Sequence, residues 1–155
     1  MLRTLLLFAI ITALGSLPSK AQSDDGWFTG RLLLLCGGDG DNGCRIQVNH
    51  AQYYNFSNMF SLGCGFGYIM DNSPLMPFSA EFRLRPSSRH GIMPMVLFSG
   101  GYAVPLGGDG KGQSIITPRI GLETGRLARF RCAFDVGCQV LGGNCNWIVG
   151  AGVVF

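Results

Sequence analysis

The sequence is apolar for a chain of 155 residues, with 47% hydrophobic residues against only 14% charged ones. Its formal net charge of +3 comes from 12 basic and 9 acidic residues, and this balance gives no indication of a nucleic-acid partner. Beyond the first residues no long unbroken apolar run occurs. High apolar content without long runs is typical of a β-barrel, whose apolar residues are spread over many alternating strands.

The amino terminus predicts a secretory signal peptide over residues 1–21. Arg3 precedes an apolar run from Leu5 to Leu14, and the small-residue site Ser19-Lys20-Ala21 follows. A membrane anchor helix is the alternative, but the run is shorter than the roughly 20 residues that span a bilayer. We therefore predict an exported protein with a barrel domain over residues 22–155. Loss of Arg3 and Lys20 leaves ten basic residues against nine acidic ones, a net charge of about +1.

Turn-forming residues divide the rest of the chain into eight segments in which apolar residues alternate with small or polar ones. The segments are 26–36, 44–54, 60–70, 76–85, 93–104, 114–123, 128–141 and 145–155. Eight is an even number, as closure of an antiparallel barrel favours. The sequence therefore predicts an all-β fold: an eight-stranded antiparallel up-and-down transmembrane β-barrel.

The connections between these segments differ in character. The connections 37–43, 71–75 and 105–113 are rich in Gly and Asp, whereas 55–59, 86–92 and 124–127 are shorter or more compact on average. If both termini lie in the periplasm, the Gly/Asp-rich set faces the cell exterior. The tight link 142–144 departs from this rule.

One face of the alternation carries charges. In segment 128–141, Arg131 and Asp135 share a face opposite Phe130 and Phe134. The same parity in the other segments gives a predicted polar network inside the lumen, where both signs are present and can pair. Its members are Glu81, Arg83, Arg119, Glu123, Arg131 and Asp135.

The other face is apolar and rich in aromatic residues. It is clearest in the last nine residues, where every second residue back from Phe155 is apolar. A membrane-spanning strand needs this alternation because one face meets lipid. The predicted lipid-facing and interfacial aromatic residues are Phe60, Phe66, Tyr68, Tyr102, Phe130, Phe134, Trp147 and Phe155.

Two places resist the pattern. Continuing the alternation through segment 44–54 points His50 and Gln52 toward lipid, so we expect either a bulge that changes the phase or an interfacial position. Pro118, in the middle of its segment, lacks the backbone donor that a paired strand needs, which also suggests a local bulge.

Several stretches together carry a family resemblance. They are the run Tyr53–Tyr68, the pairs Leu84-Arg85 and Gly101-Tyr102, the stretch Thr117–Gly121, and the terminal Phe155. In these glycine and aromatic patterns the chain resembles the small outer-membrane β-barrel domain proteins of Bacteroidota-type bacteria. The resemblance implies a closed eight-stranded barrel in the outer membrane, reached through the signal peptide. It also implies that Phe155 is the aromatic tag by which the barrel-insertion machinery recognises its clients.

Six cysteines, an even number, ordinarily indicate a disulfide framework in an exported protein. All six fall on the outward parity, and those in mid-strand resemble small apolar residues. Two pairs flank hairpin connections and are candidate bridges: Cys36 with Cys44, and Cys138 with Cys145. The family pattern does not include these cysteines. No C-x-x-C motif or Cys/His cluster indicates a metal site, and no cofactor is expected.

The residues favour a structural or loop-mediated interaction role, with a lumen filled by side chains and no general pore. Its partners would be outer-membrane lipid and an unknown ligand of the outer connections. A soluble exported β-sandwich or lipid-binding barrel is the first alternative. An enzyme that modifies lipid A is the second, but His50-Ala51-Gln52 and His90-Gly91-Ile92 lack the His-x-Ser pair such a deacylase would need, and we predict no catalytic residues.

Overall fold

The computed structural model describes residues 27–38, 45–71, 73–86, 91–107, 111–124 and 130–155. They form eight strands: β1 (Trp27–Gly38), β2 (Arg45–Asn55), β3 (Phe60–Met70), β4 (Leu75–Leu84), β5 (Met93–Pro105), β6 (Gln113–Glu123), β7 (Arg131–Leu141) and β8 (Asn144–Val154). No helix in this part of the chain is long and apolar enough to cross a membrane. The predicted signal peptide lies outside the described residues.

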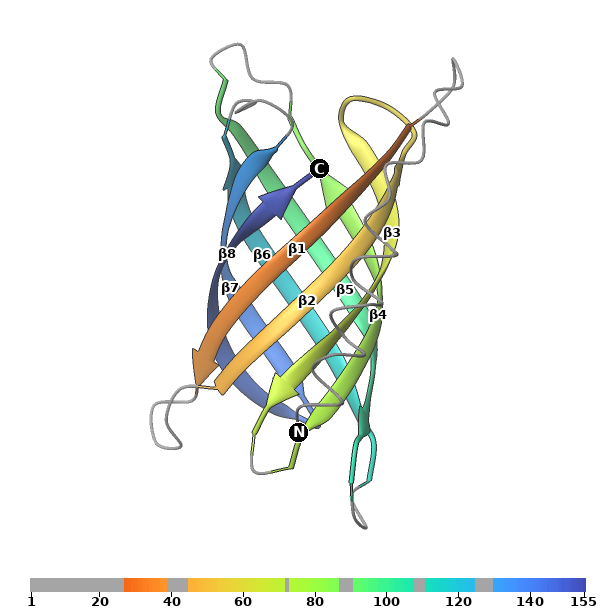
Figure 1. Cartoon of the computed structure of the whole chain (residues 1–155), viewed down its shortest axis with the longest axis vertical. Helices are drawn as coiled ribbons and strands as arrows, with labels where there is room; N and C mark the ends of the chain where they lie inside the picture. Colours follow the sequence, from red (N-terminus) through yellow and green to blue (C-terminus); the bar gives the residue numbers. More distant parts are fainter. Residues whose placement is uncertain (1–26, 39–44, 72, 87–90, 108–110, 125–129) are drawn as a thin grey trace.

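The eight strands form one closed barrel in sequence order, with every neighbouring pair antiparallel (Figure 1). Closure occurs between β1 and β8, where Leu33 pairs with Gly152 and Gly38 with Trp147. The seam is extended by two backbone hydrogen bonds between Gly30 and Phe155, of 2.8 and 3.0 Å. The predicted eight-stranded antiparallel barrel is confirmed, and the strand boundaries fall within three residues of those expected.

Up-and-down connectivity divides the strand connections between two ends. The C-terminal end holds Phe155 and the β2–β3, β4–β5 and β6–β7 connections, while the opposite end holds the other four (Figure 1). At the opposite end Gly142 and Gly143 form a two-residue hairpin with φ of +58° and +94°. Positive φ at both positions matches the twist of antiparallel strands and is readily adopted by glycine, which explains the tight link there.

Exposure alternates along the strands with a period of two, because successive side chains point to opposite faces of a sheet. On β1, Leu33 is 2% exposed and its neighbour Leu34 is 56% exposed. The inward positions hold both the buried apolar residues and nearly all of the buried charged ones, while most of the outward positions are apolar. This distribution contradicts the soluble β-sandwich alternative, since the apolar faces do not pack together in a shared core.

Neither predicted bulge occurs. Along β2 the register with β1 and β3 is unbroken, so His50 keeps its outward parity, opposite Leu32 and Phe66. Beside Pro118, β6 and β7 lose two ladder pairs, but the register is the same on both sides of the gap, from Ile116↔Val140 to Arg119↔Gly137. The missing donor of proline interrupts the ladder without inserting a residue.

Candidate functional site: the charged lumen and the apolar exterior

Three buried carboxylates organise the lumen: Glu81 on β4, Glu123 on β6 and Asp135 on β7. Asp135 pairs with Arg31 from β1 and with Arg119 from β6, the latter at 3.3 Å between Nη1 and Oδ2. Arg119 also reaches Glu81 across the barrel, with Nη2 and Oε2 3.1 Å apart. Arg119 and Asp135 lie on neighbouring strands, while the other two pairs each span one intervening strand, so the network links β1, β4, β6 and β7 through the lumen.

Nearer the C-terminal end of the barrel, Glu123 forms ion pairs with three arginines. Arg83 Nη1 lies 3.1 Å from its Oε1, while Arg85 and Arg131 each place Nη1 3.6 Å from its Oε2. Arg83 also donates to Thr29 Oγ1 at 2.9 Å. A buried guanidinium needs this density of acceptors because an unpaired charge is costly away from water.

Tyr53 links the two groups of charges. Its hydroxyl donates to Glu81, and its ring faces the Arg83 guanidinium, whose Cζ lies 4.1 Å from the ring centroid. Such a cation–π contact is strongest when it is desolvated, and Tyr53 is fully buried. We call the connected set the lumen network: Arg31, Tyr53, Glu81, Arg83, Arg85, Arg119, Glu123, Arg131 and Asp135.

The structure thus places all six predicted lumen residues in one network, together with three that the sequence prediction left out. Arg31 lies in a run in which Leu32 to Leu35 fill both faces of the strand, so the alternation disappears there. Tyr53 is aromatic, and the sequence pattern assigns aromatic residues to the outward face. Arg85 follows the last residue of β4. The one signal in the sequence for an inward Arg31 is its parity relative to the neighbouring residues of its own strand.

Apolar side chains fill the lumen near the opposite end. They form a buried cluster that we call the plug: Ile69, Leu75, Ala103, Ile115 and Leu141. Beside it Gln139 donates to Gln47 at 2.9 Å, from β7 to β2. The space between Gln47 and Arg119 is a cavity of about 10 Å³, enough for about one water molecule. Side chains therefore occupy the lumen from the network to the plug.

The barrel exterior is an apolar belt with aromatic residues near the strand ends. Phe134 and Trp147 are 53% and 52% exposed. Of the predicted outward aromatics, Phe60, Tyr102, Phe130, Phe134 and Trp147 are exposed, and Phe66, Tyr68 and Phe155 are half-buried. Exposed apolar surface that encircles a closed barrel of this kind is suited to lipid contact, whereas a soluble lipid-binding barrel keeps its apolar residues inside.

His50 is the polar exception on this exterior, and neighbouring rings cover it. Its ring centroid lies 5.3 Å from that of Phe66 and 6.3 Å from that of Phe155, and its exposure is only 2%. Gln52 lies beside it, with the two Nε2 atoms 3.3 Å apart. Phe155 can lie here because position 30 is glycine: a Cβ there would lie 2.3 Å from the Phe155 ring. The terminal aromatic residue thus shields a polar side chain at the closing seam.

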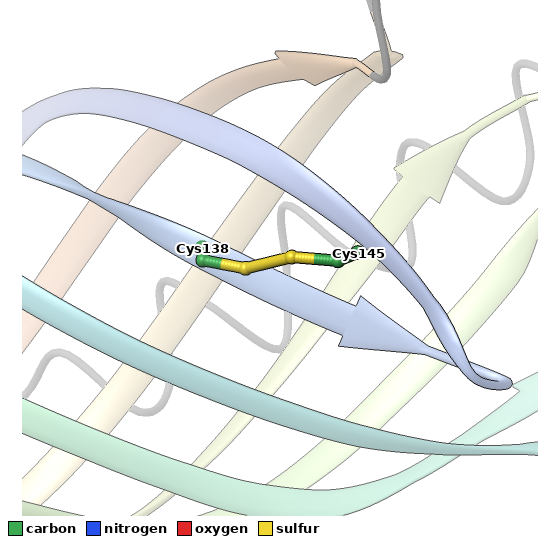
Figure 2. The surroundings of a disulfide bond; sticks show 2 residues. All are labelled: Cys138 and Cys145. Carbon is green, nitrogen blue, oxygen red and sulfur yellow. A yellow bond between two sulfur atoms is a disulfide. The ribbon is translucent and has the colours of Figure 1, made fainter.

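The structure places a disulfide between Cys138 and Cys145, which bridges the β7–β8 hairpin on its outward face (Figure 2). Their Cα atoms are 6.5 Å apart. Cys64 and Cys132 are free thiols. The other predicted bridge, between Cys36 and Cys44, stays a prediction because Cys44 lies outside the described residues.

Alkylation of the unfolded but unreduced protein should therefore modify Cys64 and Cys132 and leave Cys138 and Cys145 unmodified. Peptide mapping by mass spectrometry measures this, and reduction before alkylation is the control that should label all four. Labelling of Cys138 without reductant would contradict the assignment. Closing so short a loop is expected to stabilise the hairpin by roughly 2 kcal/mol.

Solved structures share this architecture at low sequence identity. The N-terminal β-barrel domain of OprF from Pseudomonas aeruginosa is similar with a TM-score of 0.64 and 14% identity, over 84% of this chain and 98% of that one. Neisserial surface protein A gives 0.61 and 10%, over 82% and 94%. Ail, the attachment invasion locus protein of Yersinia pestis, gives 0.52 and 13%, over 83% and 96%. No protein-family model and no curated relative matches the chain. The fold is that of the eight-stranded outer-membrane β-barrels.

Proposed function

We propose that this chain is an integral protein of a bacterial outer membrane that acts as a closed, non-conducting barrel and presents the connections of its opposite end to the exterior. The observation that carries the proposal is the filled lumen: buried ion pairs occupy one part of it, and the plug occupies the part near the opposite end. Eight strands leave an interior just wide enough for side chains to fill. A structural or interaction role therefore fits better than diffusion.

The apolar exterior supports outer-membrane lipid as the first partner. We further propose that the barrel-insertion machinery recognises Phe155, and that the chain belongs with the barrels of Bacteroidota-type bacteria, on the glycine and aromatic patterns of Tyr53–Tyr68. We also propose that the outer connections bind a ligand, whose identity is unknown. Ail has been solved with the heparin analogue sucrose octasulfate, which makes a surface-bound ligand a reasonable expectation for a barrel of this fold.

Catalysis is not part of the proposed function. The described contacts of His50 are Gln52, Phe66 and Phe155, and none of them brings an Asp or Glu side chain that would orient a histidine base. Its burial under two aromatic rings also keeps substrate lipid from the imidazole.

The purified barrel, reconstituted in a planar lipid bilayer, is expected to give no sustained unitary current steps. A general porin reconstituted in the same bilayers is the positive control, and a shift in gel mobility on boiling shows that the sample was folded. The physical reason is that ion passage requires the network and the plug to separate, at the cost of exposing paired charges and packed apolar groups. Recurrent current steps from the wild-type protein would contradict a closed lumen.

A further inference from the structure

A polar cavity opens at the opposite end of the barrel, above the plug. Its volume is about 280 Å³. We call it the vestibule. Its polar lining includes Arg45, Asp71, Lys111, Gln113, Asn144 and Asn146, and the plug residues Leu75 and Leu141 also line it. The charges of the lumen network take no part in this lining, so the vestibule is a separate site.

The charge of the vestibule favours an anion. Arg45 and Asp71 form an ion pair, with Nη2 and Oδ2 2.9 Å apart. Lys111 is exposed and forms no ion pair with another residue that the structure describes. Among the described lining residues, two cations against one carboxylate leave a net positive charge, and the ammonium and guanidinium that line the same cavity provide several donors for the oxygens of a phosphate group.

The vestibule also contains an amide, that of Asn146, without a hydrogen-bond partner among the described residues. The residue is 7% exposed, yet within the described ranges its side-chain amide has no hydrogen-bond partner. Because Asn146 lines the cavity, a ligand there can hydrogen-bond to its amide without breaking a contact within the described part of the protein. Together with the amides of Gln113 and Asn144, it offers both donors and acceptors. This combination matches hydroxyl groups, which also donate and accept.

Size and shape set the remaining limits. A cavity of about 280 Å³ lies at the small end of ligand pockets. Leu75 and Leu141, which line it, also belong to the plug, so a ligand is held there and does not pass through the barrel. We propose that the vestibule binds a small phosphorylated polyol of the sugar-phosphate class, with its phosphate at Lys111 and Arg45 and its hydroxyls at the amides. The inference rests on the proposed function, because it requires the opposite end to face the exterior.

Calorimetric titration of the folded, detergent-solubilised protein with glucose 6-phosphate tests the site. We expect saturable binding at one site per chain at low salt, with glucose and inorganic phosphate each at least about tenfold weaker, since each lacks one of the two sets of contacts. Lys111→Gln and Asn146→Ala should each weaken glucose 6-phosphate binding about tenfold or more. Asn58→Ala, an exposed asparagine in the β2–β3 connection at the C-terminal end, is the matched control and should leave binding unchanged.

Three results overturn the inference: no saturable binding by a barrel that still shows its heat-dependent gel shift, equally tight binding of inorganic phosphate, or binding that survives both variants. The proposed function is tested separately, because Lys111 is the one lysine after the predicted signal peptide. Labelling of Lys111 on intact cells by a membrane-impermeant amine reagent supports the orientation even if no sugar phosphate binds. Labelling only after cell disruption overturns the orientation, and with it both proposals.

Discussion

Replacing Asp135 with alanine is expected to destabilise the folded barrel by about 3–5 kcal/mol, because it leaves two buried arginines without their shared carboxylate. Arg31 is 1% exposed and Arg119 is 4% exposed, and both pair with Asp135. Neither guanidinium reaches water easily inside a packed lumen. The substitution therefore removes compensation for charges that stay buried, which costs more than the net value of an ion pair.

Asp71→Ala is the matched control for this experiment. Asp71 also pairs with an arginine, Arg45, at 2.9 Å, but about a third of its side chain is exposed. A solvated ion pair of this kind contributes about 0–1 kcal/mol. Equilibrium unfolding of both variants by urea in lipid vesicles gives the comparison. Equal free-energy changes for the two variants would contradict the assignment of Asp135 to a desolvated network.

The strand order and the face of each residue could be predicted from the sequence because both depend on local alternation. In β3, for example, apolar Phe60 and Leu62 alternate with small Ser61 and Gly63. A period of two is visible without knowledge of any distant contact. The six charged residues assigned to the lumen follow from the same rule, since each lies on the inward parity of a clearly alternating strand.

The partners of those charges could not be predicted, because they depend on barrel closure. Arg31 and Asp135 are separated by 104 positions in the sequence. Closure brings β1 next to β8 and places Arg31 opposite β7 residues inside the lumen. Local patterning carries no information about which inward residues meet across a barrel of this width.

His50 shows a second limit of the alternation. Its parity predicts lipid contact, from which we expect either a bulge that changes the phase or an interfacial position. The barrel keeps the parity and covers the side chain with Phe66 and Phe155 instead. Phe66 covers His50 from the β2–β3 hairpin, whereas Phe155 is adjacent to His50 only because the barrel closes between β1 and β8. Tertiary packing thus meets a requirement that local structure leaves open.

Phe134→Arg is expected to destabilise the barrel by about 2–4 kcal/mol, because it places a charge on the lipid face near the middle of β7. Phe134 is 53% exposed and lies opposite Leu122 on β6 and Ala151 on β8, so its surroundings are apolar. If Phe134 were exposed to water, its side chain would contribute little to stability, and replacing it with arginine would change stability only slightly. The size of the effect therefore reports the medium around the side chain.

Phe56→Arg provides the comparison. Phe56 is 55% exposed, nearly the same as Phe134, but it lies in the β2–β3 connection outside the strands. At that depth the cost should fall to about 0–1 kcal/mol. Both variants should also be unfolded in a detergent that leaves the barrel folded. Only the bilayer has a fixed hydrocarbon thickness, so the difference between the two substitutions should be larger in lipid vesicles than in detergent. A Phe134→Arg effect no larger than that of Phe56→Arg would mean that the belt around β6, β7 and β8 does not meet hydrocarbon. The transmembrane interpretation of the exterior would then fail.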